Sequence, residues 1–329
     1  MSTSIEWSQN PDGTAGETWN PIKSRNLETG KIGWHCERIS PGCQRCYSET
    51  QNAAAFRGGT GLLYVLPNRS KVEIFLDQKM LEKPLRWEKP RGIFVCSMSD
   101  WCADFVPDDW RDRMMAVVYL AQQHHYMFLT KRADALRSYL RNPGDLRTRI
   151  ALAITGPRLI PQHKVHLGLP SPTGIAEGIM KGWRSLTMPG IRLGVSVETQ
   201  EWADKRLPIL CELGESGWNT MVSVEPMLGP VVLPERFLAL GKRTWAIIGG
   251  ESGKNARPFD VGWARGIIQQ CQAAKVPVFC KQLGSRPIIG ERPFMEMTIG
   301  QRSITLKDRK GGDPSEWESD LRVREMPEV

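Results

Sequence analysis

The stretch GIFVCSMSD, residues 92–100, places an apolar run of strand-forming residues directly before polar ones. Five later stretches repeat the pattern: YMFLTKR (126–132), RLGVSVE (192–198), TMVSVEP (220–226), TWAIIGGES (244–252) and VPVFCKQ (276–282). Uninterrupted apolar character is typical of strands that are buried on both faces of a parallel sheet. The six runs therefore predict six such strands.

The segments between these runs carry helix signals. PDDWRDRMMAVVYLAQQ (107–123) opens with a proline and two aspartates, which are favoured in the first turn of a helix. DVGWARGIIQQCQAAK (260–275) repeats apolar residues at helical spacing. Alternating strands and helices predict βαβ units, and both a (β/α) barrel and a doubly wound sheet would satisfy this pattern.

Polar residues follow all six apolar runs at once, which favours the barrel. They are Ser97, Ser99, Asp100, Lys131, Arg132, Glu198, Glu225, Glu251, Lys281 and Gln282. In a parallel barrel the carboxyl ends of the strands meet at one mouth, where functional residues gather. The sequence therefore predicts an α/β fold with a partial (β/α) barrel of about six units.

Two segments interrupt the alternation. We expect residues 1–284 to form the barrel domain and residues 285–329 to form a C-terminal extension that caps it. Residues 141–190 are rich in proline and glycine and are interpreted as an insertion over the barrel mouth, because such long connections are usually functional. This insertion would bring His163, Lys164 and His166 near the site.

Composition places the protein among enzyme-sized globular chains. The net charge is +8, which favours an anionic partner by long-range attraction. Basic residues are nevertheless spread along the chain, so both a nucleic-acid partner and an ordinary basic surface stay open. The sequence shows no secretion signal and no long apolar window, so we expect a cytoplasmic protein without a membrane partner. In a reducing compartment, cysteines are core thiols, metal ligands or catalytic groups before they are disulfides.

Three cysteines lie close together in GWHCERISPGCQRCYSE, residues 33–49. A structural zinc site takes four ligands, so Cys36, Cys43 and Cys46 would need a fourth, and the adjacent His35 is the local candidate. A thioredoxin-like redox pair needs no third thiol. The remaining interpretation is an iron–sulfur cluster held by three thiolates, which leaves one iron open.

Three cysteines after a first expected strand, GETWNPIK (16–23), together with the barrel, resemble the radical S-adenosylmethionine superfamily. The usual spacing there is C-x3-C-x2-C, whereas this chain has the variant C-x6-C-x2-C. The stretches TWNP, SPGCQRCY, SMSDW, FLTKR, GVSVE, SVEPMLGP, IIGGESG, KQLG and GGDPSEWESDLRVRE are similar to a phage-encoded branch of that superfamily.

The resemblance implies a role for each matching position. Cys36, Cys43 and Cys46 would hold a 4Fe-4S cluster, and S-adenosylmethionine would chelate the open iron. A reductase such as a host flavodoxin or ferredoxin would supply one electron, which yields a 5′-deoxyadenosyl radical. The cofactor contacts would be Ser97, Ser99 and Asp100 for the amino group, Lys131 or Arg132 for the carboxylate, Glu198 for the ribose, and Tyr47 beside the last cysteine. Glu225, Glu251 and Lys281 would face the substrate as catalytic residues.

The same resemblance suggests a substrate in phage DNA. One concrete reaction is the isomerisation of an amino acid attached to the methylene group of thymine, in modified DNA or a nucleotide. Two alternatives stay open: a radical enzyme that acts on a small metabolite or peptide, and a non-catalytic, zinc-stabilised nucleic-acid-binding protein.

Overall fold

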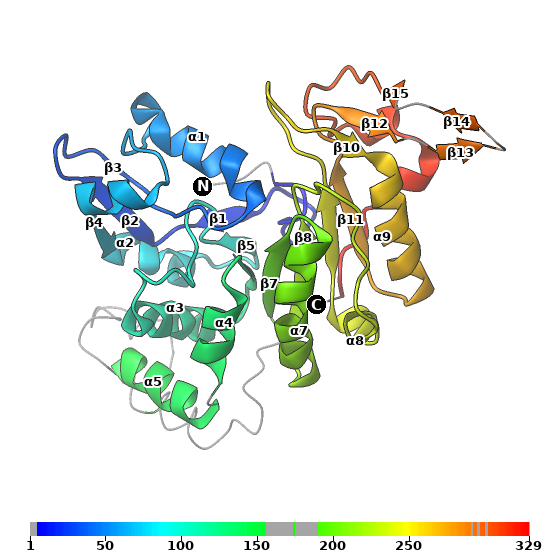
Figure 1. Cartoon of the computed structure of the whole chain (residues 1–329). Helices are drawn as coiled ribbons and strands as arrows, with labels where there is room; N and C mark the ends of the chain where they lie inside the picture. Colours follow the sequence, from blue (N-terminus) through cyan, green and yellow to red (C-terminus); the bar gives the residue numbers. More distant parts are fainter. Residues whose placement is uncertain are drawn as a thin grey trace. The chain divides into compact units, whose positions relative to one another are not determined.

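The computed structural model describes residues 5–141, 143–155, 174, 190–290, 292–294, 297–299 and 302–328 (Figure 1). The chain divides into two compact units. The first consists of Met1–Arg38 and Cys46–Arg192, and the second of Ile39–Arg45 and Leu193–Val329. Cys43 therefore clusters with the second unit, whereas Cys36 and Cys46 cluster with the first.

The main sheet has seven strands in the order β1-β5-β6-β7-β8-β9-β11. Their bounds are β1 (Glu17–Trp19), β5 (Gly92–Val95), β6 (His125–Thr130), β7 (Ile191–Val197), β8 (Asn219–Val224), β9 (Ala246–Gly249) and β11 (Val278–Gln282). β1, β5 and β6 pair in parallel, and so do β8, β9 and β11. The order follows the chain without the reversal of a doubly wound sheet. The predicted α/β fold is confirmed, and the open sheet is compatible with the predicted partial barrel.

The six apolar runs all form strands of this sheet, and β5, β7 and β9 are buried along their whole length. The helices α3 (Asp108–Leu120) and α9 (Val261–Ala273) form where the sequence predicts them. Among the described residues, the other helices of at least seven residues are α1 (Tyr47–Ala53), α4 (Ala133–Leu140), α5 (Pro143–Thr155) and α7 (Gln200–Glu215), and two short ones are α2 (Gln78–Leu81) and α8 (Glu235–Leu238). None of the described helices has the length and apolar character needed to span a bilayer.

The predicted first strand, residues 16–23, is divided between two sheets. β1 ends at Trp19, and β2 (Ile22–Asn26) pairs instead with β3 (Ile32–Gly33) and β4 (Val72–Leu76) in an antiparallel sheet. Pro21 stands between them, and a proline has no N–H group for a sheet hydrogen bond. The chain therefore leaves the main sheet just before the cysteine loop begins.

The beginning of the predicted insertion is a helix, not a loop. α5 packs against α3 and α4, and its buried Leu146, Ile150 and Ile154 recur at helical spacing. A proline at the first helical position costs no hydrogen bond, so Pro143 is compatible with this helix. His163, Lys164 and His166 lie outside the described residues.

Asp112 of α3 makes the stability of the first unit depend on pH. Its Oδ1 accepts the Tyr139 hydroxyl at 2.9 Å, and burial raises the pKa of Asp112 to about 6, against the opposing effects of Tyr139 and Arg149. The unfolded chain has a pKa of about 3.9 there and loses its proton first, so the free energy of unfolding falls as pH rises from about 4 to 6. We expect a loss of about 1 to 2 kcal/mol after solvent screening.

Urea denaturation of the wild type and of Asp112→Asn at pH 4 and pH 7 measures this contribution. The variant should lose less stability over that interval, whereas Asp109→Asn, an exposed position of the same helix, should behave as the wild type. An equal pH dependence in Asp112→Asn and the wild type would contradict the assignment.

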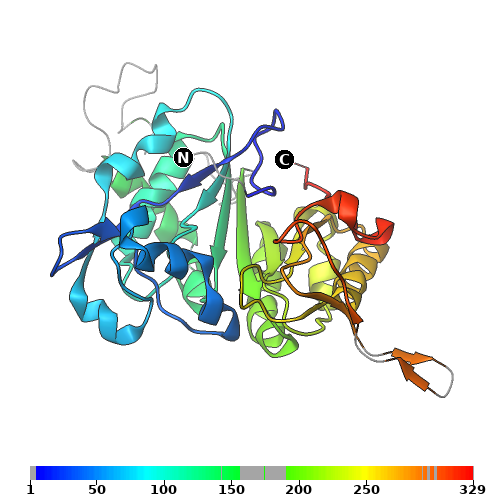
Figure 2. The ribbon, with the colours of Figure 1, turned by 90° about the horizontal axis from the view of Figure 1, so that it is seen from above.

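The C-terminal part completes the second unit. β10 (Phe259–Asp260), β12 (Pro287–Ile289) and β15 (Arg302–Ser303) form a small sheet, and the hairpin of β13 (Arg292–Phe294) and β14 (Met297–Ile299) extends away from it (Figure 2). The following tail packs closely, with Trp317 and Leu321 buried. Arg324 bridges antiparallel to Phe279 of β11, and its guanidinium lies over the Trp317 ring at 5.2 Å.

Candidate functional site

Apart from the three cysteines and Tyr47, the predicted site residues lie at or just beyond the carboxyl ends of strands, in two groups. In the first unit, Ser97, Ser99 and Asp100 follow β5, while Lys131 and Arg132 follow β6. In the second unit, Glu198, Glu225 and Glu251 follow β7, β8 and β9, and Lys281 lies near the end of β11. Each group makes its own contacts with part of the cysteine loop.

The turn after β5 is built for a sharp change of direction. Cys96 has a φ of 53°, a left-handed conformation that is uncommon for a residue other than glycine. Asn20, directly after β1, donates from Nδ2 to Ser97 Oγ at 3.0 Å and accepts the Met98 backbone N–H at 3.0 Å. The ends of two neighbouring strands are therefore tied together beneath the cysteine loop.

This turn holds both flanks of the loop within the first unit. Ser99 Oγ donates to the carbonyl oxygen of His35 at 2.7 Å, which fixes the residue beside Cys36. On the other flank, Tyr47 donates from its hydroxyl to the Ser97 carbonyl oxygen at 2.7 Å, directly after Cys46. Ser97 and Ser99 therefore position cysteines through their neighbours.

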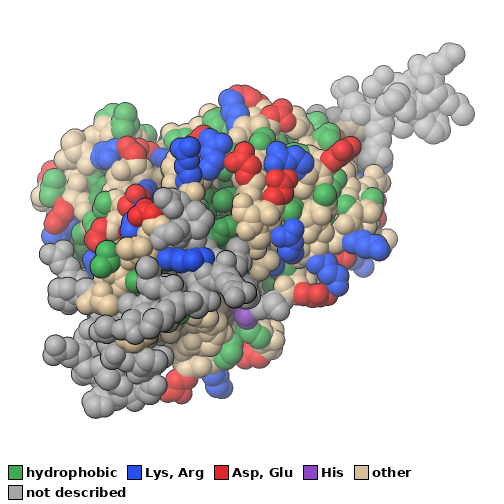
Figure 3. All heavy atoms as spheres, turned by 90° about the horizontal axis from the view of Figure 1, so that it is seen from below, with side chains coloured by type: hydrophobic (Ala, Val, Ile, Leu, Met, Phe, Trp, Pro, Cys, Tyr) green, Lys and Arg blue, Asp and Glu red, His purple; other side chains and the backbone are tan. Residues whose placement is uncertain are grey.

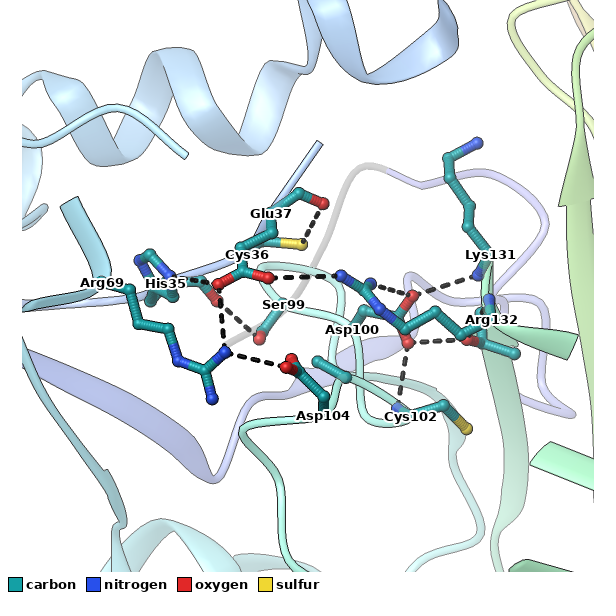
Figure 4. A network of polar contacts seen from close by, with 12 residues as sticks. His35, Cys36, Glu37, Arg69, Ser99, Asp100, Cys102, Asp104, Lys131 and Arg132 are labelled. Carbon is teal, nitrogen blue, oxygen red and sulfur yellow. Dashed lines mark hydrogen bonds and ion pairs between the residues drawn. The ribbon is translucent and has the colours of Figure 1, made fainter. Parts of the chain in front are cut away.

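Asp100 is saturated by hydrogen bonds (Figure 4). Its carboxylate accepts Thr130 Oγ1 at 2.6 Å, the backbone N–H groups of Cys102 and Lys131 at 3.0 and 3.1 Å, and Arg132 at 3.0 Å. The side chain is also buried. Its resolved role is to fix Arg132 and the end of β6.

Arg132 carries a half-buried positive charge beside Cys36. Burial alone would lower the pKa of Arg132, but Asp100, Cys36 and Glu37 raise it above its ordinary value. Glu37 Oε2 lies 4.0 Å from the guanidinium. The guanidinium therefore stays charged and can stabilise a thiolate at Cys36.

His35 is engaged away from the thiols. Its Nε2 lies 3.6 Å from Glu37 Oε1, its side chain is 2% exposed, and its ring packs on Phe105. Burial lowers the pKa of His35, although Glu37 acts in the opposite direction. These contacts disfavour His35 as a fourth zinc ligand. Among the residues that the structure describes, no three His, Cys, Asp or Glu side chains form a metal-ligand group.

The Cys43 segment packs on Glu198 within the second unit. Ser40 Oγ donates to Glu198 Oε1 at 2.7 Å, and Arg206 contacts Oε2 at 3.3 Å. Glu198 is fully buried, and a Cβ atom on Gly42 would lie 2.5 Å from its Oε1. Only glycine fits at position 42 without displacing Glu198, so the residue before Cys43 lies directly on this carboxylate.

Glu251 and Arg257 attach the same segment from a second direction. Arg257 makes a bidentate contact with Glu251, at 2.5 and 3.0 Å, and donates to the Pro41 carbonyl oxygen at 3.0 Å. Arg45 approaches Glu251 at 3.4 Å. Burial raises the pKa of Glu251, but hydrogen bonds and charge from Arg257 and Arg45 hold it below its usual value. Glu251 therefore stays ionised.

Glu225 and Lys281 form a separate ion pair at the strand ends. Lys281 Nζ lies 3.2 Å from Glu225 Oε1, and Ser223 Oγ donates to Oε2 at 3.2 Å. Both side chains remain partly exposed, at 14% for Glu225 and 23% for Lys281. Unlike Glu198, this pair can contact a substrate without unfolding its surroundings.

The cysteine loop carries the accessible thiols. All eight cysteines are thiols, and Cys36, Cys43 and Cys46 are half-buried, whereas the other five are buried. Burial raises the pKa of Cys211 to about 11 and those of Cys271 and Cys280 to about 12, which makes them poor metal ligands. The three loop thiols are therefore the accessible thiols of the chain, and thiolate is the ligand type that iron–sulfur clusters use.

Sequence reasoning missed three residues that hold the loop: Asn20, Ser40 and Arg206. Asn20 had a usable signal, since it directly follows the first strand as the other polar residues follow theirs. Ser40 had none, because its role depends on a contact with Glu198 far along the chain, and Arg206 had none, because the sequence gives no sign that its guanidinium is buried against that carboxylate.

A model of the family described as protein of unknown function (DUF5131) matches residues 2–310. Comparison with curated proteins found no match, and comparison with solved structures found none either.

Proposed function

The chain belongs to this family, DUF5131, and from that premise we propose that it is a radical S-adenosylmethionine enzyme in which Cys36, Cys43 and Cys46 hold a 4Fe-4S cluster. The observation that carries the proposal is the contrast between three accessible thiols in one anchored loop and five buried ones. When bound, the cluster and S-adenosylmethionine together supply a 5′-deoxyadenosyl radical. The protein supplies binding, orientation and charge.

The chain's own residues divide this work. Asp100 fixes Arg132, whose guanidinium keeps a positive charge beside Cys36. Glu198 and Glu251 hold the Cys43 segment on the strand ends. Lys281 Nζ can donate to an anionic or carbonyl oxygen of the substrate, while Glu225 orients the amine. Lys131, Tyr47, Ser97 and Ser99 remain candidate cofactor contacts.

For the substrate we propose an amino-acid-substituted thymine in DNA, which the enzyme isomerises. The net charge of +8 supports a polyanionic partner, and the resemblance to a phage-encoded branch supports the modified base. A small metabolite or peptide is the alternative within the same radical chemistry. Duplex DNA would have to expose its base to such a site, at a cost of a few kcal/mol.

Anaerobic reconstitution with iron and sulfide tests the radical class. We expect a brown protein with about four irons per chain, which releases 5′-deoxyadenosine from S-adenosylmethionine under reducing conditions. Cys43→Ala should lose both the iron and the release, because it removes one of three ligands. Cys211→Ala, which removes a buried thiol outside the loop, should keep both. A colourless protein that retains one zinc would refute the proposal.

A further inference from the structure

Three loops of the second unit meet at Ser285. Its hydroxyl donates to the Arg309 carbonyl oxygen at 2.6 Å and accepts the Gly253 backbone N–H at 2.9 Å. The Ser285 backbone N–H donates to the Glu251 carbonyl oxygen at 2.9 Å. The loops after β9 and β11 and the turn at 307–312 therefore form one surface, joined directly to a residue of the candidate site.

Glycines permit the closest approach between two of these loops. Gly284 and Gly311 both have positive φ, at 77° and 62°, and a Cβ atom on Gly311 would lie 2.6 Å from the Gly284 carbonyl oxygen. The Leu283 N–H donates to the Gly311 carbonyl oxygen at 2.8 Å. The turn at 307–312 is thus fixed against the end of β11.

Several basic residues stand on these joined loops, and four of them lie closest in sequence to the hydrogen bonds of Ser285. We call these four residues the basic rim, and all four are exposed: Lys254, Arg286, Arg309 and Lys310. Each of them either takes part in the hydrogen bonds of Ser285 or is adjacent in sequence to a residue that does. Within the described part of the chain, none of the four is in an ion pair. Elsewhere in this unit, some surface cations are paired, as Arg236 is with Glu215, Arg265 with Asp320 and Lys242 with Glu328, whereas the exposed Lys275 and Arg322 are in no ion pair among the described residues.

The carboxylates nearest the rim are occupied by other donors. Glu251 accepts Arg257, Asp308 accepts the backbone N–H groups of Lys310 and Gly312, and Glu316 accepts those of Lys307 and Asp308. None of these carboxylates is in an ion pair with the rim among the described residues, although the Asp308 carboxylate attracts Lys310, so most of the positive charge of the rim stays available to a ligand. Basic and acidic side chains are interspersed over the face drawn in Figure 3.

We propose that the basic rim binds the phosphate backbone of DNA. The inference rests on the proposed function, because it assigns the rim to the same substrate whose base reaches the strand ends. Contacts to phosphates position a duplex without reading its sequence, and lysine and arginine on exposed loops supply them. The hydrogen bond from Ser285 to Glu251 places this contact next to the loop that holds the Cys43 segment.

The salt dependence of DNA binding tests the rim. The probe is a short fluorescein-labelled DNA duplex, and its affinity for the reconstituted full chain is measured by anisotropy over a series of salt concentrations. The logarithm of the affinity falls linearly with the logarithm of the salt concentration, and each lost phosphate contact reduces the magnitude of this negative slope by about 0.9. In the fourfold variant, Lys254→Gln/Arg286→Gln/Arg309→Gln/Lys310→Gln, the magnitude of the slope should therefore fall by about 3 to 4. In each single variant it should fall by about 1.

Lys205→Gln is the matched control, because Lys205 is an exposed lysine paired with Glu201 on α7. It should leave the slope unchanged. If the slope were unchanged in all four single variants, the proposal that the basic rim binds DNA phosphates would be overturned, even if the fourfold variant failed to fold. Release of 5′-deoxyadenosine by the wild type is measured in parallel without DNA. If the wild-type protein released no 5′-deoxyadenosine but bound DNA with the salt dependence expected of the rim, the proposed radical function would be refuted and the DNA-binding role of the rim would stand.

Discussion

Replacing Glu198 by alanine is expected to lower the free energy of unfolding by about 3 to 5 kcal/mol. Glu198 is fully buried, and Arg206, which contacts it at 3.3 Å, is almost as deeply buried. Without the carboxylate, the Arg206 charge stays buried with less compensation, and Ser40 loses its acceptor. Denaturant unfolding measures the loss, and iron content after reconstitution should fall because the Cys43 segment is released.

A matched variant separates this effect from ordinary surface electrostatics. Glu201→Ala removes an exposed ion pair with Lys205 and should cost less than about 1 kcal/mol. The double variant Glu198→Leu/Arg206→Leu removes both buried charges and should recover much of the stability lost by Glu198→Ala, but not the iron content. A loss below about 1 kcal/mol in Glu198→Ala would contradict the buried pair.

Replacing Gly42 by alanine is expected to cost about 1 to 3 kcal/mol and to reduce iron incorporation several-fold. The added Cβ would lie 2.5 Å from Glu198 Oε1, which cannot move easily because Ser40 and Arg206 hold its carboxylate. The Cys43 segment must then shift. Urea denaturation and iron analysis of the reconstituted protein measure the two effects.

Gly266→Ala is the control for glycine replacement as such. Gly266 lies inside α9, where no atom lies within 4 Å of an added Cβ, so the change should stabilise by about 0.5 to 1 kcal/mol. If Gly42→Ala loaded iron like the wild type, the close packing of this residue on Glu198 would have no bearing on the cysteine loop.

The sheet could be predicted from sequence because its signal is local. An uninterrupted apolar run such as RLGVSVE predicts a strand that is buried on both faces, and β7 is buried along all of its residues. The polar residue that follows each run then comes to a strand end by geometry alone, which is why Glu198, Glu225 and Glu251 lie where the sequence predicts.

Some partners of these residues could not be predicted because they come from distant parts of the chain, as Ser40 does for Glu198 and Lys281 does for Glu225. Asp100 reads as an available carboxylate in the sequence, but four donors from the β5 turn and the end of β6 occupy it. Likewise, the proline and glycine of 143–144 suggest a loop, whereas packing against α3 and α4 gives a helix. At these residues, tertiary contacts override the low helix propensity of proline and glycine.

The bridge between Arg324 and Phe279 has a consequence for the protein at high concentration. β11 is the last strand of its sheet, and an uncovered last strand offers backbone groups that a strand from another copy can pair with. Here Cys280 donates its N–H to the Val323 carbonyl oxygen, and Val278 accepts from the N–H of Glu325. The tail therefore occupies the edge of β11 itself, and in doing so it limits aggregation through that strand.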